Sequence, residues 1–375
     1  MQINKERVLQ EFFELISIPC LSKNERQVAD LLTKRLEELG GTVTEDQANK
    51  VLGGNTGNLV ANFKGTVATA PKIMVSAHMD CVAPCDNIKP QIVDGVIKSD
   101  GTTILGGDDK GGVVAILETL RVLKEKNIPH GDIQVVFSVC EEQGVAGAKN
   151  IDKSLIGADF GYSLDSSGRP GKIINAAPGQ NKIFAKIHGK TSHGGVSPEK
   201  GINAIKAAGE IIVKVPSGRI DEETTCNMGI INGGRATNIV PDLVEIACDA
   251  RSRNQAKLDN LTKTIVDAFE NSCTMEGVRV EVEVVPSYGS YLLDNASSCI
   301  SLAQKAAERL GLPVNIGGTG GGSDANHYNN FGIPTTVLGT GMTNVHTCDE
   351  ILLEEDLYVT AEWLLEILTE AGGTK

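Results

Sequence analysis

Two adjacent carboxylates, Glu141 and Glu142, follow an apolar run from Ile133 to Val139 after one residue, Cys140. Carboxylates at the mouth of a buried strand cost free energy unless positive charge lies beside them. A metal ion is the simplest source of that charge, with one carboxylate as ligand and the other free to move a proton. The pair therefore predicts a metal site with a neighbouring general base. The alternative is a solvated start to a helix near Val145, where acidic side chains favour the helix dipole.

Further ligand-type residues follow other apolar segments. His78 ends IMVSAH, Asp108 lies in GGDDKGG, Asp165 ends GYSLD and His346 ends VLGTGMTNVH. We expect these four and Glu142 at or just past strand ends, because strands of an open α/β sheet present ligands at their carboxyl ends. Two imidazoles and three carboxylates suit zinc or another borderline divalent ion, and two ions can bind if one carboxylate bridges them. Any one of these residues alone could be a turn, cap or packing residue.

Two more carboxylates lie next to these candidate ligands. Asp80 is two residues past His78, a spacing that returns to the same face of a strand, so it can take the second imidazole proton and set the tautomer. Glu141 can accept a proton from metal-bound water and pass it to a leaving amine. Thiolates also bind zinc, but the carboxylates and imidazoles form the more coherent set. We therefore interpret three nearby cysteines as packing residues: Cys81, Cys140 and Cys348.

Alternating helical and strand patterns predict an α/β fold with a mostly parallel central sheet. Helical periodicity covers residues 5–18, 24–39 and 111–126, and apolar strands are expected at 59–63, 73–77, 133–139 and 160–164. From 178 to 290 the order is strand, helix, strand, strand, helix, strand, as in a ferredoxin-like α+β sandwich. We therefore expect an inserted domain at 178–290 and a discontinuous larger domain at 1–177 and 291–375.

Composition excludes several classes of function. With 35 Lys and Arg against 48 Asp and Glu, the net charge of −13 repels nucleic acid and anionic lipid, so neither is an expected partner. No apolar run approaches the about 20 residues of a membrane span, and the N-terminus does not resemble a signal peptide. Nine cysteines without a C-x-x-C fit a reducing cytoplasm. A complete phosphate loop and a G-x-S-x-G elbow are both missing, which disfavours nucleotide-dependent and serine chemistry.

The ordered motifs SAHMD, GGDDKGG, CEEQG, YSLDSS and NVHTCDE resemble the dizinc exopeptidase and amidohydrolase superfamily, which includes peptidase T, carboxypeptidase G and aminoacylase relatives. The stretches CDNIKPQIVDG and DGTTILGGDDKGG are most similar to peptidase T-like tripeptidases. The resemblance implies a catalytic domain interrupted by a lid or dimerisation domain, and a cis peptide between Asp108 and Asp109. It also implies that His78 and Asp165 complete one metal site, that Glu142 and His346 complete the other, and that Asp108 bridges the two. Glu141 is then the general base and acid, and Asp80 orients His78.

The resemblance also implies substrate-binding residues. His193, in GKTSHGG, resembles a lid histidine that stabilises the oxyanion, often from the partner subunit; the alternative is a loop histidine bonded to its own turn. Asn238 and Arg251 resemble residues that hold the peptide carbonyl or carboxylate, although Arg251 could be a surface charge. The loop GTGGGSD, with Gly321 and Gly322, is expected to line the substrate pocket, or else to be a flexible turn. Gly320 stands where peptidase T-like enzymes carry an arginine, so recognition of the substrate end is expected to differ.

The predicted function is a cytoplasmic metal-dependent exopeptidase of the tripeptidase or aminopeptidase type. The predicted cofactors are two divalent ions, zinc first and cobalt or manganese as alternatives. A metal-bridging water attacks the short peptide, and the protein is expected to be a homodimer through the inserted domain. The first alternative is an amidohydrolase acting on N-acyl or N-carbamoyl amino acids. The second is a non-catalytic zinc-binding protein, which the presence of both Glu141 and Asp80 disfavours.

Overall fold

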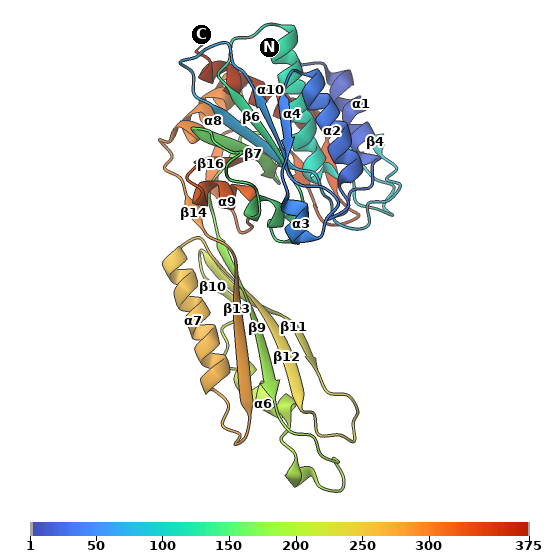
Figure 1. Ribbon diagram of the computed structural model, residues 1–375, viewed down its shortest axis with the longest axis vertical. Coiled ribbons are helices and arrows are strands. Elements are labelled where there is room, and N and C mark those ends of the chain that lie inside the picture. Colours follow the sequence, from blue (N-terminus) through green and yellow to red (C-terminus); the bar gives the residue numbers. More distant parts are fainter. Residues whose placement is uncertain (1–2, 374–375) are drawn as a thin grey trace. The chain divides into compact units, whose positions relative to one another are not determined.

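The computed structural model describes residues 3–373. The chain forms two compact units (Figure 1). The larger unit comprises Met1–Asn175, Leu293–Gly318 and Ser323–Lys375, and the inserted unit comprises Ala176–Leu292 with the short loop Thr319–Gly322. The inserted unit is thus two residues longer at each end than the sequence predicts, and it also takes in a loop that the sequence assigns to the larger domain.

A nine-stranded sheet forms the centre of the larger unit, in the order β1-β2-β6-β3-β7-β16-β8-β14, with β15 beside β8. The four central strands β6, β3, β7 and β16 run parallel, whereas the flanking strands pair antiparallel. The predicted mostly parallel sheet is therefore confirmed, and it has antiparallel edges. The strands are β1 Thr42–Glu45, β2 Leu59–Phe63, β3 Ile73–His78, β6 Ile133–Ser138, β7 Phe160–Ser166, β8 Lys172–Ala177, β14 Tyr291–Leu292, β15 Asn315–Gly318 and β16 Thr335–Gly339.

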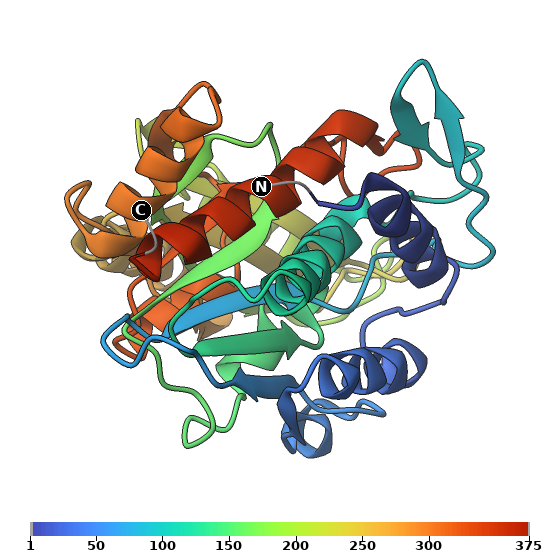
Figure 2. The ribbon, with the colours of Figure 1, turned by 90° about the horizontal axis from the view of Figure 1, so that it is seen from above.

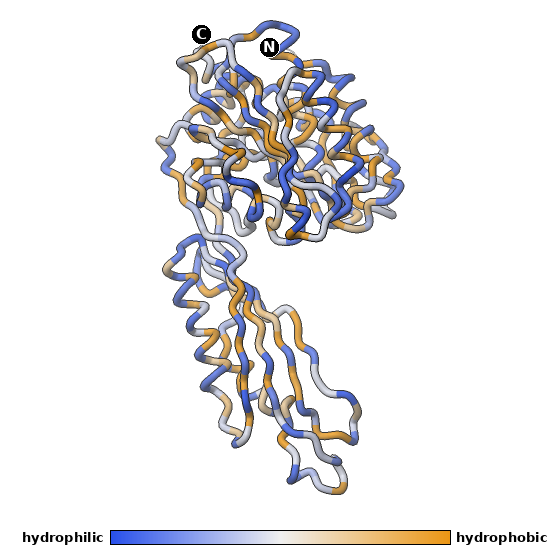
Figure 3. Tube along the Cα trace, viewed as in Figure 1, coloured by the Kyte–Doolittle hydropathy of each residue, from blue (hydrophilic) through white to orange (hydrophobic). Residues whose placement is uncertain are grey.

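Three of the four central strands are buried along their whole length. Every residue of β3, β6 and β16 is buried, without the alternation of a half-exposed strand. Such continuous apolar strands are typical of parallel sheets that are covered on both faces. Figure 3 shows the same strands as mainly hydrophobic segments in the middle of the larger unit.

Ten helices are seen in the described residues, and eight of them belong to the larger unit. Helix α4 packs against α1 and α10, and it lies on β3 and β7 (Figure 2). It is buried on nearly all sides, which explains its apolar run Val113–Leu117. The eight helices are α1 Lys5–Ile16, α2 Arg26–Glu38, α3 Ala48–Leu52, α4 Gly107–Glu125, α5 Ala146–Lys149, α8 Ser298–Arg309, α9 Asp324–Asn330 and α10 Glu354–Ala371.

A second, small sheet of the larger unit was not predicted from the sequence. It has the order β17-β18-β5-β4 and consists of antiparallel pairs. Its strands are only two or three residues long: β4 Gln91–Val93, β5 Val96–Lys98, β17 Met342–Thr343 and β18 Ile351–Leu353. The loop from β17 to β18 carries His346, so this sheet anchors one of the predicted site residues.

The inserted unit is an antiparallel sheet with two helices on one face. The strand order is β10-β11-β12-β9-β13, and α6 and α7 share an apolar core with alternate residues of the strands, such as Ile183, Ala185 and Ile187. Figure 1 shows α7 running along the sheet. The ferredoxin-like prediction is confirmed, with one additional short strand, β10. The elements are β9 Gly179–His188, α6 Ala204–Ile212, β10 Gly218–Asp221, β11 Thr224–Gly233, β12 Leu243–Ser252, α7 Gln255–Asn271 and β13 Arg279–Tyr288.

Within residues 3–373, each helix falls short of the length and apolar character that crossing a membrane requires.

Candidate functional site

The central parallel strands bring several predicted residues to one edge of the sheet. His78 is the last residue of β3, Asp165 lies near the end of β7, and Glu142 follows β6 in a short 3-10 turn. Because β6, β3 and β7 are neighbours and run parallel, these side chains share the edge at which the strands end. The expectation that Asp108 also follows a strand is wrong: it lies at the start of α4, after a loop.

Asp108 lies between the two imidazoles. Its Oδ1 is 3.1 Å from Nε2 of His78, and its Oδ2 is 3.2 Å from Nε2 of His346. Nε2 of His346 is also 3.0 Å from Oε2 of Glu142, and Nε2 of His78 is 3.8 Å from Oδ1 of Asp165. The structure therefore brings all five predicted ligands together, with the two oxygens of one carboxylate facing different histidines.

The tautomer of His78 follows from its second nitrogen. Nδ1 lies 3.0 Å from the main-chain carbonyl oxygen of Asp80, which can only accept a hydrogen bond, so Nδ1 carries a proton. In the neutral ring, Nε2 then presents a lone pair toward Asp108 and Asp165. That is the form in which a histidine binds a metal, with the other ring nitrogen donating to a carbonyl.

Asp80 contacts the acidic pair more closely than it contacts the imidazole. Its Oδ1 accepts the N–H of Glu141 at 2.9 Å, and its Oδ2 accepts the N–H of Glu142 at 3.2 Å. The carboxylate is 3.6 Å from Nδ1 of His78. The strand ends at His78, so the same-face spacing argument does not apply to Asp80. The hydroxyl of Ser22 donates to Oδ2 at 2.5 Å, a contact that no sequence motif signals.

Asp109 is a candidate that the sequence analysis did not include. It is fully buried, and its Oδ2 accepts the N–H of His78 at 3.2 Å. Potential ligand atoms of His78, Asp109 and Asp165 lie within 4.8 Å of one another, as do those of His78, Asp108 and Glu142. The doubled acid in GGDDKGG was the available signal. The peptide bond between Asp108 and Asp109 is cis, as the resemblance implied.

Negative charge greatly exceeds positive charge in this cluster. In the described part of the chain, the ion-pair partners of its acids are two imidazoles, His78 and His346. Lys110, although adjacent in sequence, donates instead to the main-chain oxygen of Met79. The cluster contains seven carboxylates: Asp80, Asp108, Asp109, Glu141, Glu142, Asp165 and Asp324.

The titration of the cluster reflects this excess. Hydrogen bonds to Asp108 and then to Glu142 raise the pKa of His346 to about 10. Burial, followed by the charge of Asp165, raises the pKa of Glu141 well above its usual range. Burial also raises the pKa of Asp165. The raised pKa values of His346, Glu141 and Asp165 indicate a local excess of negative charge, which additional cationic charge would stabilise.

The five predicted substrate-binding residues lie in the inserted unit. Nδ1 of His193 accepts the N–H groups of Gly195 and Val196, both at 3.1 Å. One ring nitrogen is therefore bonded to its own turn, as the alternative predicts, and the proton lies on the other nitrogen, Nε2. Asn238 is exposed, and its main-chain oxygen accepts the N–H of Gly194. None of these contacts tests a role in substrate binding.

Arg251 and the glycine loop have local partners in the inserted unit. The guanidinium of Arg251 binds both carboxylate oxygens of Asp249, at 2.8 and 3.2 Å. Gly321 is exposed, whereas a Cβ on Gly322 would lie 2.3 Å from the ring of Tyr288. The absence of a side chain at Gly322 is therefore a packing requirement, and the role of the loop in substrate binding stays a prediction.

Comparison with known proteins gives consistent results across the chain. A family model described as "Peptidase family M20/M25/M40" matches residues 74–370. The crystal structure of aminopeptidase PepT from Bacillus cereus is 44% identical, covers 98% of this chain and 99% of its own, and has a TM-score of 0.92. A tripeptidase structure from Staphylococcus aureus is 40% identical, covers 100% of both chains and has a TM-score of 0.96. Peptidase T of Fusobacterium nucleatum is 28% identical over 92% of this chain and 90% of its own.

Proposed function

Because this chain belongs to peptidase family M20/M25/M40 and is a peptidase T-like metallopeptidase, we propose that it releases an amino acid from the end of short peptides, tripeptides among them. The resemblance stated from the sequence motifs is thereby confirmed at the level of the family. The observation that carries the proposal is the position of Asp108 between His78 and His346, with one carboxylate oxygen facing each imidazole.

The donor set of the cluster fits a pair of divalent ions. Oε1 of Glu142 and Oδ1 of Asp109 are buried and have no hydrogen-bond partner among the described residues, so they are available as ligands. We assign His78 and Asp165 to one ion, Glu142 and His346 to the other, and Asp108 to both. Imidazole and carboxylate ligands suit zinc best, with cobalt or manganese as alternatives. When bound, such ions polarise the scissile carbonyl and lower the pKa of the attacking water to about 7.

Glu141 is the residue we propose for proton transfer. It directly precedes the proposed ligand Glu142 in the turn after β6, so it lies beside the metal site, where a carboxylate can take a proton from the attacking water and return it to the leaving amine. Its main chain is held by Asp80, so the carboxylate starts from a fixed backbone. Water adds across the amide in this reaction, and the products are a free carboxylate and a free amine.

We also propose roles for the inserted unit. The proton on Nε2 of His193 suits donation to a developing oxyanion, from either subunit of a dimer. Asn238, Arg251, Gly321 and Gly322 are proposed to bind the peptide. Recognition of the substrate end is proposed to differ from that of peptidase T-like enzymes, because Gly320 offers no guanidinium to a carboxylate.

A homodimer through the inserted unit is a further part of the proposal. Within residues 3–373, strand β10 pairs only with the first residues of β11, Thr224–Cys226. Further along β11, Ile230 and Ile231 are each 58% exposed, which gives a partly apolar strand edge of the kind that pairs across a two-fold axis. Changing Ile231 to Lys should yield a monomer in multi-angle light scattering, and a monomeric wild-type protein would contradict this arrangement.

The central experiment measures metal content and activity together. We expect two equivalents of divalent metal per chain, and release of one amino acid from tripeptides with a free N-terminus. A matched panel of N-acyl and N-carbamoyl amino acids tests the deacylation alternative. Turnover confined to that panel would replace the peptidase assignment. Absence of turnover on every amide at full metal occupancy would favour a metal-binding protein without catalysis, and one metal or none per chain would contradict the assigned ligand set.

The cytoplasmic location is proposed from the nine cysteines, none of which is paired in a disulfide in the described residues. Cell fractionation tests it directly.

A further inference from the structure

One buried carboxylate, Glu350, holds the main chain that carries Asp108. Glu350 is 1% exposed and follows His346 by four residues. Its Oε2 accepts the N–H groups of Leu105 and Gly106, both at 2.9 Å, and its Oε1 accepts the N–H of Asp108 at 3.0 Å. Both oxygens of this side chain are therefore committed to the loop at the start of α4.

The geometry explains why this loop needs a carboxylate. Leu105 and Gly106 precede α4 and Asp108 has non-helical backbone angles, so their buried N–H groups need an acceptor from elsewhere, and a charged acceptor binds them more strongly than a neutral one. Gly107 lies within the same turn, and a Cβ there would be 3.0 Å from Oε1 of Glu350. The missing side chain lets the carboxylate approach Asp108 closely, so the loop and Glu350 fit each other at van der Waals distance.

The same contact joins two segments that are distant in sequence. Glu350 directly precedes β18, where Leu352 is buried and pairs with Ile97 of β5. The segment that supplies His346 is thus anchored to β5 by the pairing of β18. Through the hydrogen bonds of Glu350, it also fixes the segment that supplies Asp108. Nε2 of His346 and Oδ2 of Asp108 meet at 3.2 Å only if both segments keep this relation.

We infer that Glu350 is a positioning residue: it sets the main chain of Asp108 against the His346 loop and so prepares the bridging carboxylate to bind both metal ions. This inference rests on the proposed function, because it assigns Asp108 to metal binding. Glu350 donates no atom to the cluster itself, since its two oxygens bond to main-chain N–H groups.

Two substitutions change the charge and the position of this carboxylate one at a time. Glu350→Gln keeps the length but removes the charge and turns an N–H₂ group toward a main-chain donor. Glu350→Asp keeps the charge but is one methylene shorter, so it cannot reach all three N–H groups. Loss of a residue that orients a ligand typically costs about 10- to 100-fold in metal affinity. We expect both variants to bind Zn²⁺ about 10- to 100-fold more weakly than wild type in both binding steps. The measurement is a titration of the metal-stripped full-length protein with Zn²⁺ in competition with a chromophoric chelator.

Glu118→Gln is the matched control. Glu118 is also a fully buried carboxylate and lies on the same helix, α4, but it accepts hydrogen bonds from Arg7 and from the N–H of Asn4. We expect it to lower the thermal midpoint of the metal-free protein and to leave the Zn²⁺ dissociation constants within about twofold of wild type. Should Glu350→Gln or Glu350→Asp fold poorly, Gly107→Ala keeps every charged group and crowds Oε1 from the other side. It should weaken Zn²⁺ binding in the same direction.

The outcomes distinguish this inference from the proposed function. A wild-type protein that does not bind two Zn²⁺ ions contradicts the proposed function. A wild-type protein that binds two, with Glu350→Asp and Gly107→Ala both at wild-type affinity, overturns the role of Glu350 alone. A lowered metal-free midpoint at unchanged affinity also overturns it, because Glu350 would then stabilise the fold without positioning Asp108.

Discussion

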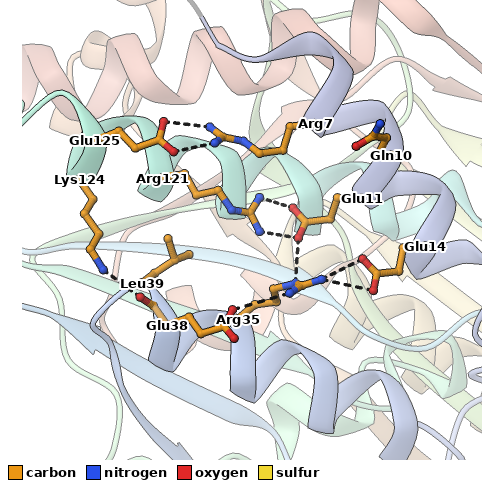
Figure 4. A pocket seen from close by; sticks show the side chains of 10 residues that line it. All are labelled: Arg7, Gln10, Glu11, Glu14, Arg35, Glu38, Leu39, Arg121, Lys124 and Glu125. Carbon is orange, nitrogen blue, oxygen red and sulfur yellow. Dashed lines mark hydrogen bonds and ion pairs between the residues drawn. The ribbon is translucent and has the colours of Figure 1, made fainter.

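Two regions of the larger unit are rich in carboxylates. In one region the carboxylates are paired with basic side chains, and in the other they are largely unpaired. The first is a groove where α1, α2 and α4 meet (Figure 4), which we call the interhelical groove. The second is the cluster around Asp108 at the edge of the central sheet. The charged residues that line the groove are four basic and four acidic side chains: Arg7, Arg35, Arg121 and Lys124, with Glu11, Glu14, Glu38 and Glu125.

Guanidinium groups neutralise the acids of the groove. Arg7 binds Glu125 at 2.6 Å, Arg35 binds Glu14 at 3.0 Å, and Arg121 binds Glu11 through two of its nitrogens. Figure 4 shows these forks joining the three helices. Glu11, Glu14 and Glu125 each face a guanidinium from a neighbouring helix, and Glu38 faces Arg35 of its own helix. The groove therefore has little remaining affinity for a cation, and its charges serve to pack helices together.

The cluster around Asp108 has no such compensation, since seven carboxylates share two imidazoles there. The difference indicates that carboxylates are available for metal binding or proton transfer where the chain does not supply basic side chains to neutralise them. A hollow surface lined by charges is therefore a poorer guide to the proposed active site than the local imbalance of charge.

The largest expected effect in this comparison comes from Glu141→Gln. Removing the proposed general base should lower kcat by about 10²- to 10⁴-fold, while both metal ions stay bound. Steady-state kinetics on a tripeptide, with metal analysis of the same sample, measures this. Glu14→Gln makes the same chemical change in the interhelical groove and should leave kcat unchanged. Wild-type kcat in Glu141→Gln would remove Glu141 from the mechanism.

Arg7→Met should act on stability and not on catalysis. Arg7 binds Glu118, which is fully buried, at 2.7 Å, so the substitution removes the nearest cation of a buried carboxylate and leaves only Arg121, at 4.0 Å. We expect a loss of about 2–4 kcal/mol in the free energy of unfolding, with kcat and metal content of the folded protein unchanged. Lys64→Met is the control, because its ion pair with Asp132 is exposed and should be worth less than about 1 kcal/mol. Equal losses in the two variants would contradict the distinction.

Ser22→Ala should have a moderate effect on catalysis. The hydroxyl donates to Oδ2 of Asp80, the carboxylate that holds the main chain of Glu141 and Glu142. Loss of one such hydrogen bond, at about 1 kcal/mol, corresponds to an about fivefold fall in kcat. Ser17→Ala removes an exposed hydroxyl that bonds to the carbonyl of Glu14, and it should leave kcat as it is. An unchanged kcat in Ser22→Ala would show that Asp80 needs no support from the N-terminal segment.

Glu125→Gln should give the smallest effect, visible as a pH dependence. The hydrogen bond from Arg7 lowers the pKa of Glu125 below its usual value of 4.5. A lowered pKa means that the ion pair stabilises the fold above that value and that the contribution disappears as the pH falls through the pKa in the folded state. Because Glu125 is largely exposed, we expect only a few tenths of a kcal/mol at neutral pH. Urea unfolding of wild type and variant should converge in acid; a difference that grows in acid would contradict this sign.

The sequence determined much of the chemistry and of the fold class. The residue types His78, Asp108, Glu142, Asp165 and His346 predicted a metal-binding set, and apolar runs such as Ile133–Val139 indicated buried parallel strands. Both inferences depend on local properties: the ligand chemistry of a side chain and the periodicity of a short segment. The sequence also predicted the inserted domain, because apolar and polar residues alternate along its strands, as in a sheet with one exposed face.

Only the tertiary structure decided how these residues are held. Asp108 lies at the start of a helix, and the carboxylate of Asp80 accepts the N–H groups of the acidic pair. The structure also places Ser22, Asp109 and Glu350 around the site. It also showed that the acids of the groove are neutralised, whereas those of the cluster are not. The contact between Glu350 and Leu105 spans 245 positions. Such contacts leave no local pattern in a sequence, because they exist only after distant segments have packed together.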